Sequence, residues 1–385
     1  MKLSLGAIIL ATTIFSFIPV HAAKNADLNV AAFEVEAGRD AEALAGSSSI
    51  RAPLAGDDAS VDRLLADIRN YTTGLANRGP YEEDLKRRLA AISSIWSLGE
   101  IGNPRVMDKL AGFYFESDEI IRMNILISIG KLKTQKAIPF LRQTAASENE
   151  TMVVRSVAFE LLEALGDDFK LEQVAPSRVR GMEDSDIIFT GSFLGTPIGE
   201  PITTPGGHVG LFVKTEVRDG RIISEIVDCM PNVVKPGGVR KASWSLFTTK
   251  FKFPFYGNRT TREKPSAAQR AAISDAALAE LGHRYNNLHD TQKGPLEFDC
   301  VGLVEYAYES AGLNPTPDKF ETGWSWPLTP AEQFLHTAAN QPAATPYITA
   351  ATPGSKNAEA SLSLGLFGVT GPTAVTTSIT PVPAD

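Results

Sequence analysis

The sequence predicts an α+β protein built from two modules, an all-α repeat followed by a mixed domain of strands and helices. Residues 61–165 keep a helical period throughout, whereas from about residue 181 the chain consists of β-branched runs separated by glycine and proline. The chain has 385 residues, 43% of them hydrophobic and 21% charged, which is enough to bury more than one core. We therefore expect two folded modules flanked by tails.

The N-terminus predicts export. Lys2 precedes an apolar stretch over residues 3–20, and Val20, His21 and Ala22 form a site of the kind that signal peptidase cuts. We assign residues 1–22 to a signal peptide and expect a periplasmic or secreted protein; an uncleaved membrane anchor is the alternative. No later stretch approaches the roughly 20 apolar residues of a membrane span, so we expect none in the mature chain. Residues 23–57 lack any period and read as a flexible linker.

Residues 58–170 predict a helical repeat domain. Leu85, Leu89, Ile92, Ile95 and Trp96 are spaced to cover one helix face. Three glycines that each follow an apolar helix, Gly99, Gly130 and Gly166, recur about 31 and 36 residues apart. Each repeat unit also contains a second helix, as at 106–115 and 137–145. This pattern resembles HEAT-type repeats, and the resemblance implies an α-solenoid that serves as a scaffold or docking surface for a protein partner.

Residues 181–340 form the predicted second module. One strand-like run precedes Gly207 and another follows it, so we expect His208 at the start of the second strand. Arg218, Asp219 and Gly220 then predict a turn into a second strand of a hairpin, which carries two acids. These acids, Glu225 and Asp228, differ in parity, so only one of them shares a face with His208, and the register that decides between them is not deducible.

A nucleophile is predicted at the start of a helix. In "EFDCVGLVEYAYESAGLNP" apolar residues recur at helical spacing, with Gly312 at the C-terminal end and Pro315 beyond it. Cys300 lies in the first turn and Asp299 precedes it as a cap. We expect the helix N-terminus to lower the pKa of the Cys300 thiol and to favour its nucleophilic thiolate.

These two motifs carry a family resemblance. "FDCVGLVEYAY" resembles the Asp-Cys-Ser-Gly-Leu-Val helix start of NlpC-type cysteine peptidases, and "GGHVGLFV" resembles their His-Val-Gly strand. Their order is reversed here, which resembles the permuted, YiiX-like branch of this papain-like superfamily over residues 181–336. Val301 departs from the usual serine after the nucleophile, and Ser185 stands where a glycine often precedes the first strand.

The resemblance implies a circularly permuted papain-like α+β domain and a cysteine hydrolase. Cys300 would be the nucleophile, His208 the base, and Glu225 the acid that orients the histidine, while Tyr285 matches a tyrosine near the substrate or oxyanion. The expected substrate is a peptide or acyl compound, with amide bonds of peptidoglycan fragments first. An ester or amide of a fatty acid is the alternative substrate, because permuted relatives also resemble the lecithin-retinol acyltransferase group.

The sequence disfavours several other classes of function. A net charge of −8 disfavours a nucleic-acid partner. His283 and His289 lack the paired spacing of metal ligands, so we expect neither a metal nor a cofactor. A non-catalytic adaptor remains an alternative, in which Cys229 bridges Cys300 in a structural disulfide. Residues 341–385, rich in Ala, Thr, Pro, Ser and Gly, read as a disordered tail.

Overall fold

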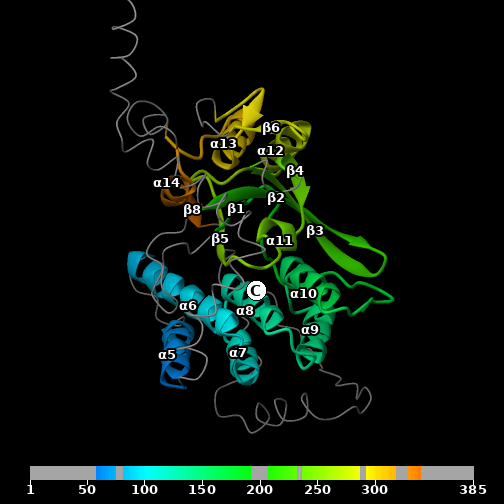
Figure 1. Cartoon of the computed structure of the whole chain (residues 1–385). Helices are drawn as coiled ribbons and strands as arrows, with labels where there is room; N and C mark the ends of the chain where they lie inside the picture. Colours follow the sequence, from blue (N-terminus) through cyan, green and yellow to red (C-terminus); the bar gives the residue numbers. More distant parts are fainter. Residues whose placement is uncertain are drawn as a thin grey trace, which may run out of the picture. The chain divides into compact units, whose positions relative to one another are not determined.

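Helices precede a mixed region with an antiparallel sheet, as expected from the two patterns in the sequence (Figure 1). The computed structural model describes residues 58–74, 81–191, 207–231, 234, 236–286, 292–317 and 328–339. The proposed signal peptide, the linker over 23–57, the tail over 341–385 and His289 lie outside these residues. Among the described helices, none combines the length and the apolarity that crossing a membrane requires.

The first part of the chain consists of successive helices. These are α5 (Asp58–Gly74), α6 (Tyr81–Ile101), α7 (Met107–Tyr114), α8 (Glu119–Lys131), α9 (Ala137–Ala146) and α10 (Met152–Ala164), with a 3₁₀ turn η3 (Pro104–Val106) before α7. Each buries an apolar stripe against its neighbours, and α8, α9 and α10 pack on one another.

Two of the three recurring glycines lie at close contacts between helices. Gly99 and Gly130 lie within the last turns of α6 and α8 instead of following them, which corrects the expected position. A Cβ on Gly130 would come within 2.3 Å of Leu161 of α10, and a Cβ on Gly99 within 2.9 Å of Ser128 of α8. Gly99 and Gly130 therefore mark where helices approach closely, whereas a Cβ on Gly166, which follows α10 at φ 79°, would meet no atom within 4 Å.

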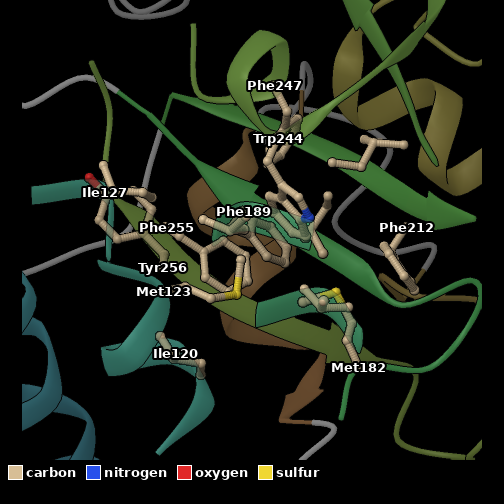
Figure 2. Packing of buried hydrophobic residues seen from close by; sticks show 14 of the residues in the cluster. Ile120, Met123, Ile127, Met182, Phe189, Phe212, Trp244, Phe247, Phe255 and Tyr256 are labelled. Carbon is tan, nitrogen blue, oxygen red and sulfur yellow. The ribbon is translucent and has the colours of Figure 1, made fainter. Parts of the chain in front are cut away.

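Helix α8 is buried around its whole circumference, from Ile120 to Ile129. Apolar residues on all sides are typical of a helix enclosed by other elements. One side of α8 packs in the repeat, and the other reaches the sheet, where Figure 2 shows Met123 beside Phe255 and Tyr256. The helices and the sheet consequently share one continuous hydrophobic core.

The sheet has six strands in the order β4-β3-β2-β1-β5-β8, and every pair within it is antiparallel. The strands are β1 (Ile187–Thr190), β2 (His208–Arg218), β3 (Arg221–Met230), β4 (Gly238–Ala242), β5 (Phe255–Thr260) and β8 (Ala338–Ala339). Asp219 and Gly220, with φ of 51° and 74°, make the tight hairpin turn between β2 and β3, as the sequence predicted.

The remaining elements surround the sheet. They are α11 (Trp244–Phe247), α12 (Ala267–Ala279), α13 (Cys300–Ser310), α14 (Pro330–His336) and the parallel pair β6 (Arg284–Tyr285) and β7 (Glu297–Phe298). Helix α13 begins at Cys300, and the Asp299 side chain caps it by accepting from the Gly302 amide at 2.7 Å. Gly312, at φ 76°, closes its C-terminus, so both predicted ends of this helix are confirmed.

Candidate functional site

A buried chain of three side chains links His208 to the neighbouring strands. His208 is the first residue of β2, and its Nε2 lies 3.0 Å from Oδ2 of Asp228 on β3. Arg240 of β4 donates to the same carboxylate from Nε at 2.8 Å and from Nη2 at 3.3 Å. All three residues are at most 5% exposed. Burial works to raise the pKa of Asp228, but hydrogen bonds and positive charge from His208 and Arg240 together bring it below its usual value.

The carboxylate beside the histidine is Asp228 and not Glu225, which corrects the assignment implied by the resemblance. Gly210 pairs with Asp228, so His208, two residues from Gly210, shares a face with Asp228 and lies diagonally across from it. Glu225 has the opposite parity and forms an ion pair with Lys241 at 3.0 Å. The strand register, which the sequence leaves open, thus selects the aspartate.

Cys300 lies beside the start of the histidine strand. It occupies the first position of α13, and the backbone amides of Val209 and Val301 are near enough to lower the pKa of its thiol. Helix α13 packs on β2, so the fold brings the start of this helix to the strand that begins with His208, 92 positions earlier in the sequence. The Cys300 residue is 8% exposed, which leaves part of its surface open to solvent.

The environment of the thiol differs from the sequence expectation. Burial, followed by the nearby Asp299 carboxylate, raises the pKa of the Cys300 thiol far above its ordinary value, and the two backbone amides only partly offset this. The predicted lowering by the helix N-terminus is therefore wrong for this structure. At neutral pH the sulfur carries its proton, so a reaction at Cys300 needs a base that removes the proton during attack.

Asp299 is fixed by residues outside its own helix. Gln292 donates from Nε2 to the Asp299 carboxylate and to the Leu328 carbonyl at 3.0 Å, and its Oε1 accepts from the Leu328 amide at 2.9 Å. Gln292 is 2% exposed and Asp299 1%. The buried glutamine therefore ties the start of α13 to the chain before α14.

Tyr285 and Cys229 also lie in the electrostatic neighbourhood of Cys300. Burial raises the pKa of Tyr285 well above its usual value, and charge on Cys300 or Asp299 would raise it further. The phenol is thus a neutral O–H donor near the sulfur. Cys229 is a free thiol, as is Cys300, and its Sγ donates to the Phe298 carbonyl at 3.1 Å. Burial raises the pKa of Cys229 well above its ordinary value.

Sequence reasoning missed two residues of this site. Arg240 holds Asp228, and the Phe247 ring lies against the imidazole of His208 with 5.2 Å between the ring centroids. The strand "GVRKA" carries two adjacent cations, and because side chains alternate between the faces of a strand, Arg240 and Lys241 cannot both point to the same side; this is the signal that could have indicated a buried cation. Among the described residues, no cluster of three His, Cys, Asp or Glu side chains is arranged to hold a metal ion.

Comparison with known proteins identifies the helical part of the chain. The family of HEAT repeats matches residues 84–163, which run from α6 into α10. No curated protein and no solved structure matches the chain. The helical region is therefore HEAT-like, and it is followed by a mixed α/β region with an antiparallel sheet.

Proposed function

We propose that the chain is an exported thiol hydrolase with a permuted papain-like domain, in which Cys300 is the nucleophile and His208 the base. The observation that carries the proposal is the convergence of β2 and α13, because the start of α13 packs against the strand whose first residue, His208, is held by Asp228. Nε2 of the imidazole faces the carboxylate, so Nδ1 is the nitrogen that would receive the thiol proton. Asp228 replaces Glu225 as the third member of the triad.

The reaction proceeds in two halves. His208 takes the proton of Cys300 as the sulfur attacks the acyl carbon, and the amine or alcohol then leaves with that proton. A thioester on Cys300 remains. Water attacks the thioester while His208 takes a proton from it, and collapse returns the proton to the sulfur and releases the acid. The Tyr285 hydroxyl and the Cys300 amide would donate to the developing oxyanion.

Cell-wall peptides are the first substrate class of this proposal, and acyl esters or amides the second. The proposed export places the protein where peptidoglycan fragments occur, and the motifs around Cys300 and His208 support amide cleavage by their resemblance to NlpC-type peptidases. The fatty-acyl alternative rests on the permuted order of the two motifs. Both substrates pass through a thioester on the same sulfur.

Trapping that thioester tests the proposal. Purified protein is mixed with soluble peptidoglycan peptides, N-acyl amides or acyl esters and quenched in acid, and the intact mass and the released products are measured. We expect an adduct on Cys300 and product release with one substrate class, both lost in Cys300→Ala. An adduct in Cys300→Ala, or turnover that persists without Cys300, would overturn the assignment.

The HEAT match supports a second role, the binding of a protein partner by the helices. As a purely non-catalytic adaptor the chain would need no reactive thiol. Complementation of cells that lack the protein, by wild type or by Cys300→Ala, compares the two roles, since the adaptor alternative expects full activity from Cys300→Ala and the hydrolase proposal expects none.

A further inference from the structure

Polar contacts between the repeat helices and the sheet converge on one short stretch of chain. This stretch, residues 243–255, contains α11 and leads into β5, and we call it the α11 segment. Helices α6, α8 and α10 each send at least one polar side chain to it; these are Trp96, Asn124, Lys131 and Glu160. The contacts are made to its backbone, so they fix the path of the segment whatever side chains it carries.

Glu160 of α10 holds the beginning of α11. Its two carboxylate oxygens accept from the backbone amides of Trp244 at 3.0 Å and Ser245 at 2.7 Å. These amides are among the first of the helix and have no partner within it. Figure 1 shows α11 beside α10, in agreement with these bonds. The repeat module thus adds to the cap made by Ser243, whose side chain accepts from the Leu246 amide at 3.4 Å.

The other end of the segment is held in an unfavourable backbone conformation. Thr249, Lys250 and Phe251 have φ of 44°, 55° and 62°, which is the left-handed region that side chains with a Cβ disfavour. The next carbonyl, that of Lys252, accepts from Trp96 Nε1 at 3.0 Å and from Lys131 Nζ at 3.2 Å. Strain of this kind persists only where surrounding contacts enforce it, and here α6 and α8 provide them.

The α11 segment in turn touches the histidine and its supporting chain. Phe247 packs on the His208 ring at 5.2 Å between centroids. The Leu246 carbonyl accepts from Nη2 of Arg240 at 3.4 Å, and Arg240 holds the Asp228 carboxylate. One end of α11 is therefore fixed by the repeat helices, and the other end contacts the imidazole and the arginine behind it.

We propose that the HEAT-like helices position His208 through the α11 segment, with Glu160 as a positioning residue. The inference rests on the proposed function, since it concerns the base of that hydrolase. The helical module is then a structural part of the catalytic site and not only a docking surface. Small displacements of a base are known to have large effects on rate, which is why an indirect contact of this kind has a measurable consequence.

The test measures the rate constant for alkylation of Cys300 by iodoacetamide in the full chain. Glu160→Gln removes the charge that caps α11, and Trp96→Phe removes one indole donor at the other end of the segment. Glu163→Gln is the matched control, because Glu163 lies on the same helix and also contacts the sheet, at 3.2 Å from Arg221, but away from the α11 segment. Thermal unfolding of every variant verifies that it is folded.

We expect Glu160→Gln to slow alkylation roughly tenfold, Trp96→Phe to slow it less, and Glu163→Gln to leave it unchanged. A double-mutant cycle then separates positioning from general loosening: in the His208→Gln background, Glu160→Gln should have no further effect. Additive effects in that cycle, or equal rates for Glu160→Gln and Glu163→Gln, would overturn the inference. If His208→Gln alkylates at the wild-type rate, both the hydrolase proposal and this inference are overturned. If His208→Gln slows alkylation but the Glu160 and Trp96 variants react at the wild-type rate, only this inference is overturned.

Discussion

Oδ2 of Asp228 lies 3.0 Å from Nε2 of His208, and the two side chains are 0% and 3% exposed. Arg240 binds the same carboxylate and is itself almost wholly buried. A carboxylate enclosed between a cation and an imidazole fixes the orientation of the ring and the nitrogen that faces outward.

Removal of Asp228 should harm both reactivity and stability, whereas removal of Glu225 should harm neither. Asp228→Ala leaves the Arg240 charge buried without its partner, for which we expect a loss of about 3 to 5 kcal/mol in the free energy of unfolding. Glu225→Gln disrupts a pair whose lysine is half exposed, so a change below about 1 kcal/mol is expected. Urea unfolding measures both. Equal losses, or a larger loss for Glu225→Gln, would restore Glu225 as the partner of His208.

The charge of Asp299 should restrain the reactivity of Cys300. Asp299→Asn keeps a side chain that caps helices well but removes the negative charge near the sulfur. The pKa of the thiol should fall, the thiolate fraction should rise, and alkylation near pH 8 should become faster. In the wild type the rate should still climb with pH above about pH 9, because burial keeps the thiol protonated. A slower variant, or a wild-type plateau below neutral pH, would contradict this electrostatic account.

The two cysteines should react very differently in the folded protein. Cys229 is fully buried and bonded to the Phe298 carbonyl, whereas Cys300 retains some exposure. We expect one thiol to be labelled under native conditions without reductant and the second only after unfolding, with peptide mapping assigning the first to Cys300. If neither thiol labels until a reductant is added, the two are bridged, and the adaptor alternative gains support.

Glu119 should make the stability of the protein depend on pH. Burial, more than any other effect, raises its pKa to about 7 despite hydrogen bonds from Thr151 and Met182. A carboxyl group with a raised pKa stabilises the fold while protonated, and this contribution is lost as the pH rises through 7. The side chain is partly exposed, so about 2 kcal/mol is a reasonable size for the loss.

Urea unfolding at about pH 5 and about pH 8 tests this expectation, with the exposed Glu116→Gln as control. Glu119→Gln should gain stability relative to wild type at the higher pH and should show less pH dependence. A wild type and a Glu119→Gln variant with parallel pH profiles would show that Glu119 is ionised in the fold throughout this range.

The sequence predicted the elements better than it predicted their electrostatics. The helix from Cys300, its Asp299 cap and the Asp219–Gly220 turn follow from local rules, and the structure has each of them. The partner of His208 depends on a strand register, which is set by pairing between segments and is not encoded in either strand alone.

The pKa of Cys300 was mispredicted for a related reason. A helix N-terminus can be read from a sequence, but the depth at which it is buried cannot, and burial outweighs the two amides at the sulfur. Likewise Arg240 binds Asp228 and Glu160 binds the start of α11 from other elements, and the local sequence does not indicate the partner of a contact made across the fold. Polar contacts between distant segments are therefore the part of the site that could not be predicted from the sequence.

The most direct test of the account is the dependence of Cys300 alkylation on His208. The rate constant is measured by mass spectrometry for wild type, His208→Gln and His208→Ala at about pH 7.5, with thermal unfolding as the check of folding. Because the thiol is protonated at this pH and the imidazole is the proposed base, we expect the alkylation rate constant to fall roughly a hundredfold in both variants. Folded variants that react as fast as wild type would contradict the pairing of Cys300 with His208.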